Sequence, residues 1–171
     1  MLWIRGLLFT VLVPWMVGVA VTQWISGENR AAAWPAQAAG WFLAAVGAMF
    51  YAVSLLRFLQ AGGTPAIYFT RPLRWVLGDE PPALVERGFY RFTRNPMYVG
   101  VITAVLAQSL LYQSWGVALY GVLLWPWFHF VVTVLEEPHL REKMGASYDA
   151  YCQRVPRWLW KVKGRGPAVL I

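Results

Sequence analysis

Three long stretches without a charged residue divide the chain, and their lengths predict membrane-spanning helices. A helix needs about 20 apolar residues to cross about 30 Å of hydrocarbon. The third stretch would extend for about 60 Å as one helix, at about 1.5 Å per residue, so it must fold back. The polar residues Tyr112, Gln113 and Ser114 mark the expected turn. The stretches cover residues 6–27, 31–56 and 95–135, and we expect spans at about 5–25, 38–59, 97–112 and 115–136.

Composition agrees with this pattern. The chain is 58% hydrophobic and 13% charged, about half the charge of a soluble domain, which is about 25%. A single Cys excludes a disulfide scaffold and a Cys-rich zinc site, and we expect no metal. We therefore predict an all-α, polytopic membrane protein of about four transmembrane helices plus short cytoplasmic C-terminal helices. The first stretch is too long for a signal peptide and lacks an A-x-A-like cleavage site.

The distribution of charge predicts the orientation. With these four spans, 14 of the 15 Lys and Arg residues fall on one side of the membrane, and only Arg30 falls on the other. Cytoplasmic segments carry the excess of Lys and Arg, so both termini and the segment 61–94 are expected in the cytoplasm. Topology and anionic lipid then explain the net charge of +7. A nucleic-acid partner is not expected.

The two halves of the chain differ in character, although we expect one domain over 1–171. Residues 1–60 hold two spans without an internal charge, and small residues in the second span permit close helix packing. These small residues are Gly40, Ala44, Ala45, Gly47 and Ala48. The aromatic-rich segment 61–94 is too long for a simple connection. The candidate chemistry is therefore expected in residues 61–171.

The start of the third span is the first place with candidate chemistry. Pro96 suits the first turn of a helix, and Asn95 before it is a natural N-cap. A helix N-terminus attracts anions, and Arg94 adds a permanent cation suited to a carboxylate or phosphate. The three residues predict an anion-binding site at the membrane surface. An ordinary capped helix with a snorkelling arginine explains the same pattern.

The end of the fourth span carries the second group of polar residues. His129, Thr133 and Glu136 follow at i, i+4 and i+7 and should share one helix face. Polar groups within a span usually face the bundle interior or a cavity. Glu136 is therefore expected to face a ligand, with Glu137 solvated or paired to a base such as Arg141. The plainer alternatives are that both glutamates are solvated and that His129 only packs.

An amphipathic stripe follows the glutamates. It predicts a surface helix against the bundle or the headgroups, and Gly145 divides it into two short helices. Tyr148 and Tyr151 could meet a ligand, although packing is the commoner role. The stripe consists of Leu140, Met144, Tyr148, Tyr151 and Val155.

Taken together, these blocks resemble the isoprenylcysteine carboxyl methyltransferase and phospholipid methyltransferase superfamily. The resemblance covers about residues 62–158 and includes Gly63-Thr64-Pro65 and Leu84-Val85-x-x-Gly88-x-Tyr90. Its main blocks are Arg94-Asn95-Pro96-Met97-Tyr98-Val99-Gly100, Glu136-Glu137-Pro-x-Leu140 and Met144-Gly145-x-x-Tyr148-x-x-Tyr151-x-x-x-Val155-Pro156-Arg157. The chain differs from eukaryotic members in having Asn95 for His and Val132 for Arg. It also carries an additional acidic segment, Gly-Asp-Glu-Pro-Pro, before Leu84.

The resemblance implies methyl transfer from S-adenosylmethionine to a lipophilic acceptor that enters from the bilayer, with residues 61–171 as the cofactor-binding catalytic core. We expect the protein in a bacterial inner membrane. The acceptor would be a prenylcysteine-like carboxylate, a lipid amine or a thiol. The implied cofactor contacts are Leu84, Val85, Tyr90, Asn95, Pro96, Met97, Tyr98 and Glu136, and the catalytic candidates are Arg94, Glu137 and His129.

Different acceptors place different demands on this chemistry. A carboxylate or thiolate needs no base, whereas an amine must lose a proton, for which Glu136, Glu137 and His129 are candidates. Two other functions are compatible with the pattern. One is a membrane reductase of the sterol-reductase type that uses a nicotinamide cofactor, and the other is a non-catalytic membrane interaction protein.

Overall fold

The computed structural model describes residues 2–26, 32–65 and 78–159, and within these ranges the chain forms helices and connecting segments without a strand. This confirms the all-α prediction. Arg30, which the charge pattern places opposite the other cations, lies outside the described residues. The elements are α1 (Leu2–Thr10), η1 (Val11–Ala20), α2 (Val21–Ser26), α3 (Trp34–Gln60), η3 (Gly88–Arg91), α5 (Pro96–Tyr112), α6 (Trp115–Val131), η4 (Val132–Glu136), α7 (Glu137–Met144) and α8 (Ala146–Arg154).

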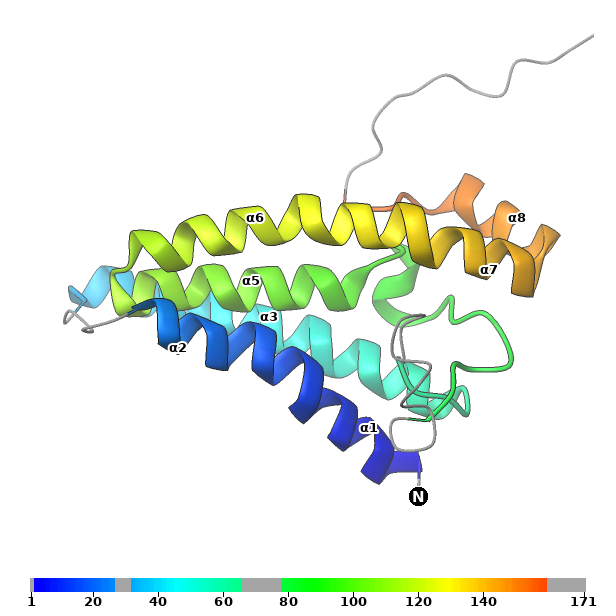
Figure 1. The fold of residues 1–171 in the computed structure, drawn as a ribbon, viewed down its shortest axis with the longest axis horizontal. Helices are drawn as coiled ribbons and strands as arrows, with labels where there is room; N and C mark the ends of the chain where they lie inside the picture. Colours follow the sequence, from blue (N-terminus) through cyan, green and yellow to red (C-terminus); the bar gives the residue numbers. More distant parts are fainter. Residues whose placement is uncertain (1, 27–31, 66–77, 160–171) are drawn as a thin grey trace, which may run out of the picture.

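Three helices in the described ranges are long and apolar enough to cross a membrane. They are Trp3–Ser26, Trp34–Gln60 and Trp115–Met144, and they include three of the four predicted spans. The fourth, α5, is apolar but has only 17 residues, about 26 Å at about 1.5 Å per residue. Figure 1 shows α5 running beside α6 and α3 in one bundle, with α7, α8 and residues 78–95 gathered at one end.

The turn between α5 and α6 lies where the polar residues predict it. Gln113 has a left-handed backbone, with φ of 51°, and closes α5. Ser114 is the N-cap of α6, and its hydroxyl accepts a hydrogen bond from the amide of Val117 at 3.4 Å. The two helices are therefore antiparallel neighbours.

Small residues bring α3 and α5 into backbone contact. A Cβ added at Gly47 would lie 2.7 Å from the carbonyl oxygen of Gly100, and one at Gly100 would lie 2.8 Å from that of Gly47. A Cβ at Gly40 would meet the side chain of Leu111 at the same distance of 2.7 Å. The predicted close packing of the second span is thus confirmed at Gly40 and Gly47, and it fixes the position of α5 on α3.

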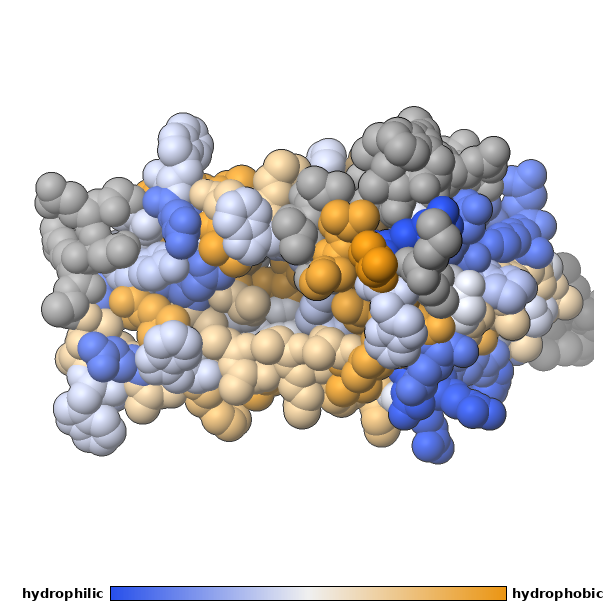
Figure 2. Space-filling model, turned by 90° about the horizontal axis from the view of Figure 1, so that it is seen from below, coloured by the Kyte–Doolittle hydropathy of each residue, from blue (hydrophilic) through white to orange (hydrophobic). Residues whose placement is uncertain are grey.

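The surface of the bundle matches its setting. Large apolar side chains such as Trp24, Trp34 and Trp115 are exposed, as expected where lipid takes the place of water. Figure 2 shows the view from below, with apolar residues over the middle of the bundle and hydrophilic residues gathered at the end that carries α7 and α8. The site described next lies towards this hydrophilic end.

The amphipathic stripe forms two short helices, as predicted. Gly145, with φ of +56°, separates α7 from α8. Tyr148, Tyr151 and Val155 are buried and pack with Leu84 and other apolar residues. The stripe therefore packs against the segment 78–95, and it encloses the space next to that segment.

Candidate functional site

Helices α3 and α5 to α8 and the segment 78–95 line a cavity of about 430 Å³, within the range of about 300–1,000 Å³ usual for small-molecule sites. Its wall is largely apolar and includes Leu84, Val85 and Met144. The cavity continues between η1 and α6, where described side chains of both helices line it without a charge. These are Pro14, Met16, Val17, Trp127, Phe128 and Val131.

The cavity brings together nine of the eleven residues singled out from the sequence. Leu84, Val85, Tyr90, Arg94, Asn95, Met97, Tyr98, Glu136 and Glu137 line it. Pro96 is buried at the start of α5 and is not among the residues that line the cavity. His129 faces away, and its Nδ1 accepts a hydrogen bond from Nε1 of Trp158 at 3.1 Å.

The single polar face predicted for His129, Thr133 and Glu136 is wrong. The five residues of η4 are π-helical, and the amide of Glu137 bonds the carbonyl of Val132, five residues earlier. This wider turn shifts the angular phase of all residues after it. The Thr133 hydroxyl donates to the His129 carbonyl at 2.8 Å. His129 and Glu136 therefore face different neighbours.

Glu136 presents its carboxylate to the cavity. The hydroxyl of Tyr98, on the first turn of α5, donates a hydrogen bond to Oε1 of Glu136. The Tyr98 ring packs on Phe128, with centroids 4.4 Å apart. No Lys, Arg or His of the described ranges lies within ion-pair distance of Glu136. The carboxylate thus has acceptor capacity left for a donor in the cavity.

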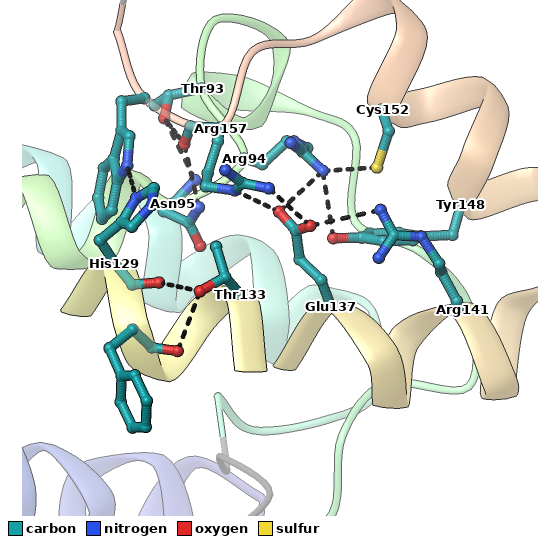
Figure 3. A network of polar contacts seen from close by, with 12 residues as sticks. Thr93, Arg94, Asn95, His129, Thr133, Glu137, Arg141, Tyr148, Cys152 and Arg157 are labelled. Carbon is teal, nitrogen blue, oxygen red and sulfur yellow. Dashed lines mark hydrogen bonds and ion pairs between the residues drawn. The ribbon is translucent and has the colours of Figure 1, made fainter. Parts of the chain in front are cut away.

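Glu137, in contrast, is a buried carboxylate surrounded by arginines, so that of the two predicted alternatives, solvated or paired to a base such as Arg141, the structure shows the pairing. Its side chain is only 3% exposed. Three arginines converge on it in Figure 3. Arg157 bonds both carboxylate oxygens, with Nε–Oε1 at 2.6 Å and Nη2–Oε2 at 2.9 Å. Arg94 Nη1 lies 3.1 Å from Oε1, and Arg141, the predicted partner, has Nη2 3.4 Å from Oε2. We call these four residues the Glu137 cluster.

Arg94 keeps one donor unused. Its Nη1 also contacts the hydroxyl of Tyr148 at 3.5 Å and Sγ of Cys152. Its Nε is buried and has no hydrogen-bond partner among the described residues. An unsatisfied buried donor costs about 1–3 kcal/mol, more for a charged group. Arg94 also lines the cavity, where its guanidinium offers a positive charge to an anionic group.

Asn95 holds the N-cap position of α5, but its side chain does not cap the helix. The carbonyl oxygen of Arg157 accepts bonds from Asn95 Nδ2 and Thr93 Oγ1, both at 3.0 Å. The carbonyl of Pro156 accepts from the amide of Arg94 at 2.9 Å. The segment after α8 thus holds the Asn95 side chain and the start of α5 in place.

Two further contacts attach the segment 78–95 to the C-terminal helices. Oε1 of Glu80 lies 2.8 Å from Nε2 of His139, and Oε2 lies 3.1 Å from Nζ of Lys143. Tyr151 donates its hydroxyl to the carbonyl of Tyr90 at 2.7 Å. Burial raises the pKa of both Tyr151 and Tyr90 above the ordinary value, so both hydroxyls are protonated at neutral pH.

Sequence reasoning assigned no role to Arg157, Glu80, His139 or Lys143. Arg157 stands in the quoted motif, and its bonds to Glu137 raise its pKa. Glu80 was visible only as part of an additional acidic segment. The partners of both residues lie far away in the chain, so local pattern gave no signal for either pair.

The comparisons with known proteins all point to membrane methyltransferases. The family described as phospholipid methyltransferase matches residues 35–147, about two thirds of the chain. Protein-S-isoprenylcysteine O-methyltransferase of Schizosaccharomyces pombe is 38% identical over 74 residues, which cover 43% of this chain and 31% of that protein. Protein-S-isoprenylcysteine O-methyltransferase B of Arabidopsis thaliana is 33% identical over 79 residues, covering 46% and 40%. The match spans less than half the length of each relative. No solved structure matches the chain.

Proposed function

Because this chain belongs to the phospholipid methyltransferase family, we propose that it is an integral membrane enzyme that transfers the methyl group of S-adenosylmethionine to a lipophilic acceptor. One observation carries the proposal. Arg94 and Glu136, the latter without a cationic partner among the described residues, line the same cavity of about 430 Å³. A cavity lined by one guanidinium and one available carboxylate suits a zwitterionic ligand.

The residues present match this cofactor. Arg94 binds its carboxylate, and Glu136 accepts hydrogen bonds from its amino or hydroxyl groups. Tyr98 holds the Glu136 carboxylate in place. The aromatic faces of Tyr90 and Tyr98 stabilise positive charge by cation–π attraction. When bound, S-adenosylmethionine supplies a methyl group already activated by its positively charged sulfonium.

The chain's own contribution is mainly alignment and exclusion of water. The walls from Leu84, Val85, Met97, Leu140 and Met144 keep the space between Arg94 and Glu136 apolar. A carboxylate or thiolate acceptor reacts without losing a proton. For an amine acceptor, Glu136 is the best-placed base of the three candidates, because arginines occupy both oxygens of Glu137 and His129 lies away from the cavity.

The uncharged part of the cavity between η1 and α6 accommodates the lipophilic group of the acceptor. Two observations support this assignment: the lining there is apolar, from Met16, Val17, Trp127 and Phe128 among others, and the named relatives act on isoprenylcysteine. The cation-rich end, with the segment 78–95 and α7–α8, faces the cytoplasm, where the water-soluble cofactor is available. A bacterial inner membrane is the expected location.

Calorimetry of the full chain in detergent tests the proposal. S-adenosylhomocysteine should bind, and NADPH should not. Arg94→Gln should weaken S-adenosylhomocysteine binding by about tenfold or more, since hydrogen bonds to charged groups contribute about 1.5–3 kcal/mol. Binding of NADPH in place of S-adenosylhomocysteine would instead indicate the reductase function, and binding of neither would indicate a non-catalytic protein.

A further inference from the structure

We propose that Arg157 is a positioning residue of the cofactor site, which compensates the charge of Glu137 and so leaves Arg94 available to an anion in the cavity. The inference rests on the function proposed above, in which Arg94 binds the cofactor carboxylate. It adds a residue from the segment after α8, ten positions beyond the region that matches the family.

The geometry of the Glu137 carboxylate is the first argument. Left alone with Arg94, whose Nη1 lies 3.1 Å from Oε1, Glu137 would cancel most of the charge of that guanidinium. Arg157 makes the two shortest contacts with the carboxylate, at 2.6 and 2.9 Å, and both are charge-assisted. The Glu137 carboxylate thus interacts mainly with Arg157, and its negative charge neutralises less of the charge of Arg94.

The charge balance of the cluster is the second argument. Three arginines surround Glu137, and the only other acidic group paired to them in the described ranges is Asp149, 3.4 Å from Arg141. Three positive charges against two negative charges leave one positive charge. Of the three arginines, Arg94 lines the cavity. The excess charge therefore includes a guanidinium that an anion in the cavity can approach.

The attachment of Arg157 is the third argument, because a positioning residue must itself be fixed. Its carbonyl oxygen accepts bonds from Asn95 and Thr93, the two residues that flank Arg94. The neighbouring Trp158 donates to His129 on α6, and the carbonyl of Pro156 accepts from the Arg94 amide. Main chain and side chain of residue 157 thus fix the backbone and the guanidinium of Arg94 together.

The test is calorimetric binding of S-adenosylhomocysteine to full-length variants in one detergent, with thermal melting measured in parallel. Arg157→Gln should weaken binding by about tenfold, and Arg157→Lys, which keeps the charge but not both bonds, should recover part of that loss. Arg154→Gln is the matched control, because Arg154 is 61% exposed and pairs with Glu86 at the surface; its binding should equal that of the wild type.

A double variant separates positioning from a general effect on the fold. In an Arg94→Gln background, Arg157→Gln should cause no further loss of affinity, because it acts through Arg94. Additive losses would overturn the inference. The inference would also be overturned if Arg157→Gln bound with wild-type affinity while Arg94→Gln bound more weakly. That result would leave the proposed function intact. Wild-type affinity in Arg94→Gln would instead overturn the assignment of Arg94 and with it the inference. If Arg157→Gln does not fold, the same cycle is run with Arg157→Lys.

Discussion

Glu136 and Glu137 are adjacent in the chain, yet their carboxylates have opposite surroundings. Glu136 accepts one hydrogen bond from Tyr98 and faces the cavity, without a cation from the described ranges beside it. Glu137 is buried among Arg94, Arg141 and Arg157. The end of η4, where the π-helical turn meets α7, directs the two side chains to different neighbours. One glutamate is thus available to a ligand, and the other is committed to the structure.

Glu136→Gln should weaken the binding of S-adenosylhomocysteine by about 10- to 100-fold, because it removes the charge that accepts hydrogen bonds from the ligand. Titration calorimetry in detergent measures this effect. Glu142→Gln, at an exposed position of the adjoining α7, is the control and should bind like the wild type. Equal affinities of the two variants would show that Glu136 does not contact the cofactor.

Glu137→Gln should act on stability. Removing one partner of a buried ion pair leaves uncompensated charge and costs about 3–5 kcal/mol. The free energy of unfolding in detergent, from a denaturant titration, measures the change. Glu86→Gln is the matched control, because it breaks the exposed pair with Arg154, and such a pair is worth about 0–1 kcal/mol. A variant Glu137→Gln as stable as Glu86→Gln would contradict the buried cluster.

Gly47→Ala and Gly100→Ala should each destabilise the bundle by about 1–3 kcal/mol, because the new methyl groups overpack the contact of α3 with α5. The nearest atoms belong to the opposite backbone, at 2.7 and 2.8 Å, and cannot move aside like a flexible side chain. Thermal melting in detergent is the measurement. Gly18→Ala, where nothing lies within 4 Å of the new Cβ, should melt like the wild type; a matching loss there would refute the packing argument.

The features that could be predicted from the sequence depend on local signals. The length of the uncharged stretches predicted the long helices. The polar residues around Gln113 predicted the turn, and Gly145 predicted the break between α7 and α8. Gly47 predicted the close packing of α3, because small residues in membrane helices let two backbones approach closely. Each of these signals lies within or next to the element that it predicts.

The features that could not be predicted depend on distant partners or on irregular geometry. Glu137 is buried because Arg157 and Arg94 reach it from other segments. Asn95 makes no capping bond, and its Nδ2 donates instead to the carbonyl of Arg157, a residue distant in the chain. The assumption of 100° per residue fails across η4, so the predicted face of His129 and Glu136 does not exist. The residues that gather around the cavity were largely identified from motifs, whereas their individual contacts were not.

The orientation can be tested independently of the site. A reporter fused after Gln113, in the turn between α5 and α6, should give a periplasmic signal, and one fused after Ile171 a cytoplasmic signal. The reason is the distribution of Lys and Arg, 14 of which fall on one side when the chain crosses four times. A cytoplasmic signal after Gln113 would mean that α5, with its 17 residues, does not span the membrane with α6.

Glu80 should control how long the cofactor stays bound. Its carboxylate joins the segment 78–95 to α7 through His139 and Lys143, and Lys143 also donates to the carbonyl of Pro81 at 3.3 Å. Glu80 and Pro81 belong to the cavity wall, so these contacts hold that wall against α7. Glu80→Gln keeps the side chain's size and removes the charge that both partners contact.

We expect Glu80→Gln to increase the dissociation rate of S-adenosylhomocysteine by about three- to tenfold, because partly buried charged contacts contribute about 1 kcal/mol or more. Lys143→Gln, which breaks the same contact from α7, should have a similar effect. The rate is measured by stopped-flow displacement, with Glu86→Gln as the control, since Glu86 pairs at the surface and does not line the cavity. Equal dissociation rates in all three variants would show that the wall stays closed without Glu80 and that the packing of Leu84 on Tyr148 and Tyr151 is enough to hold it.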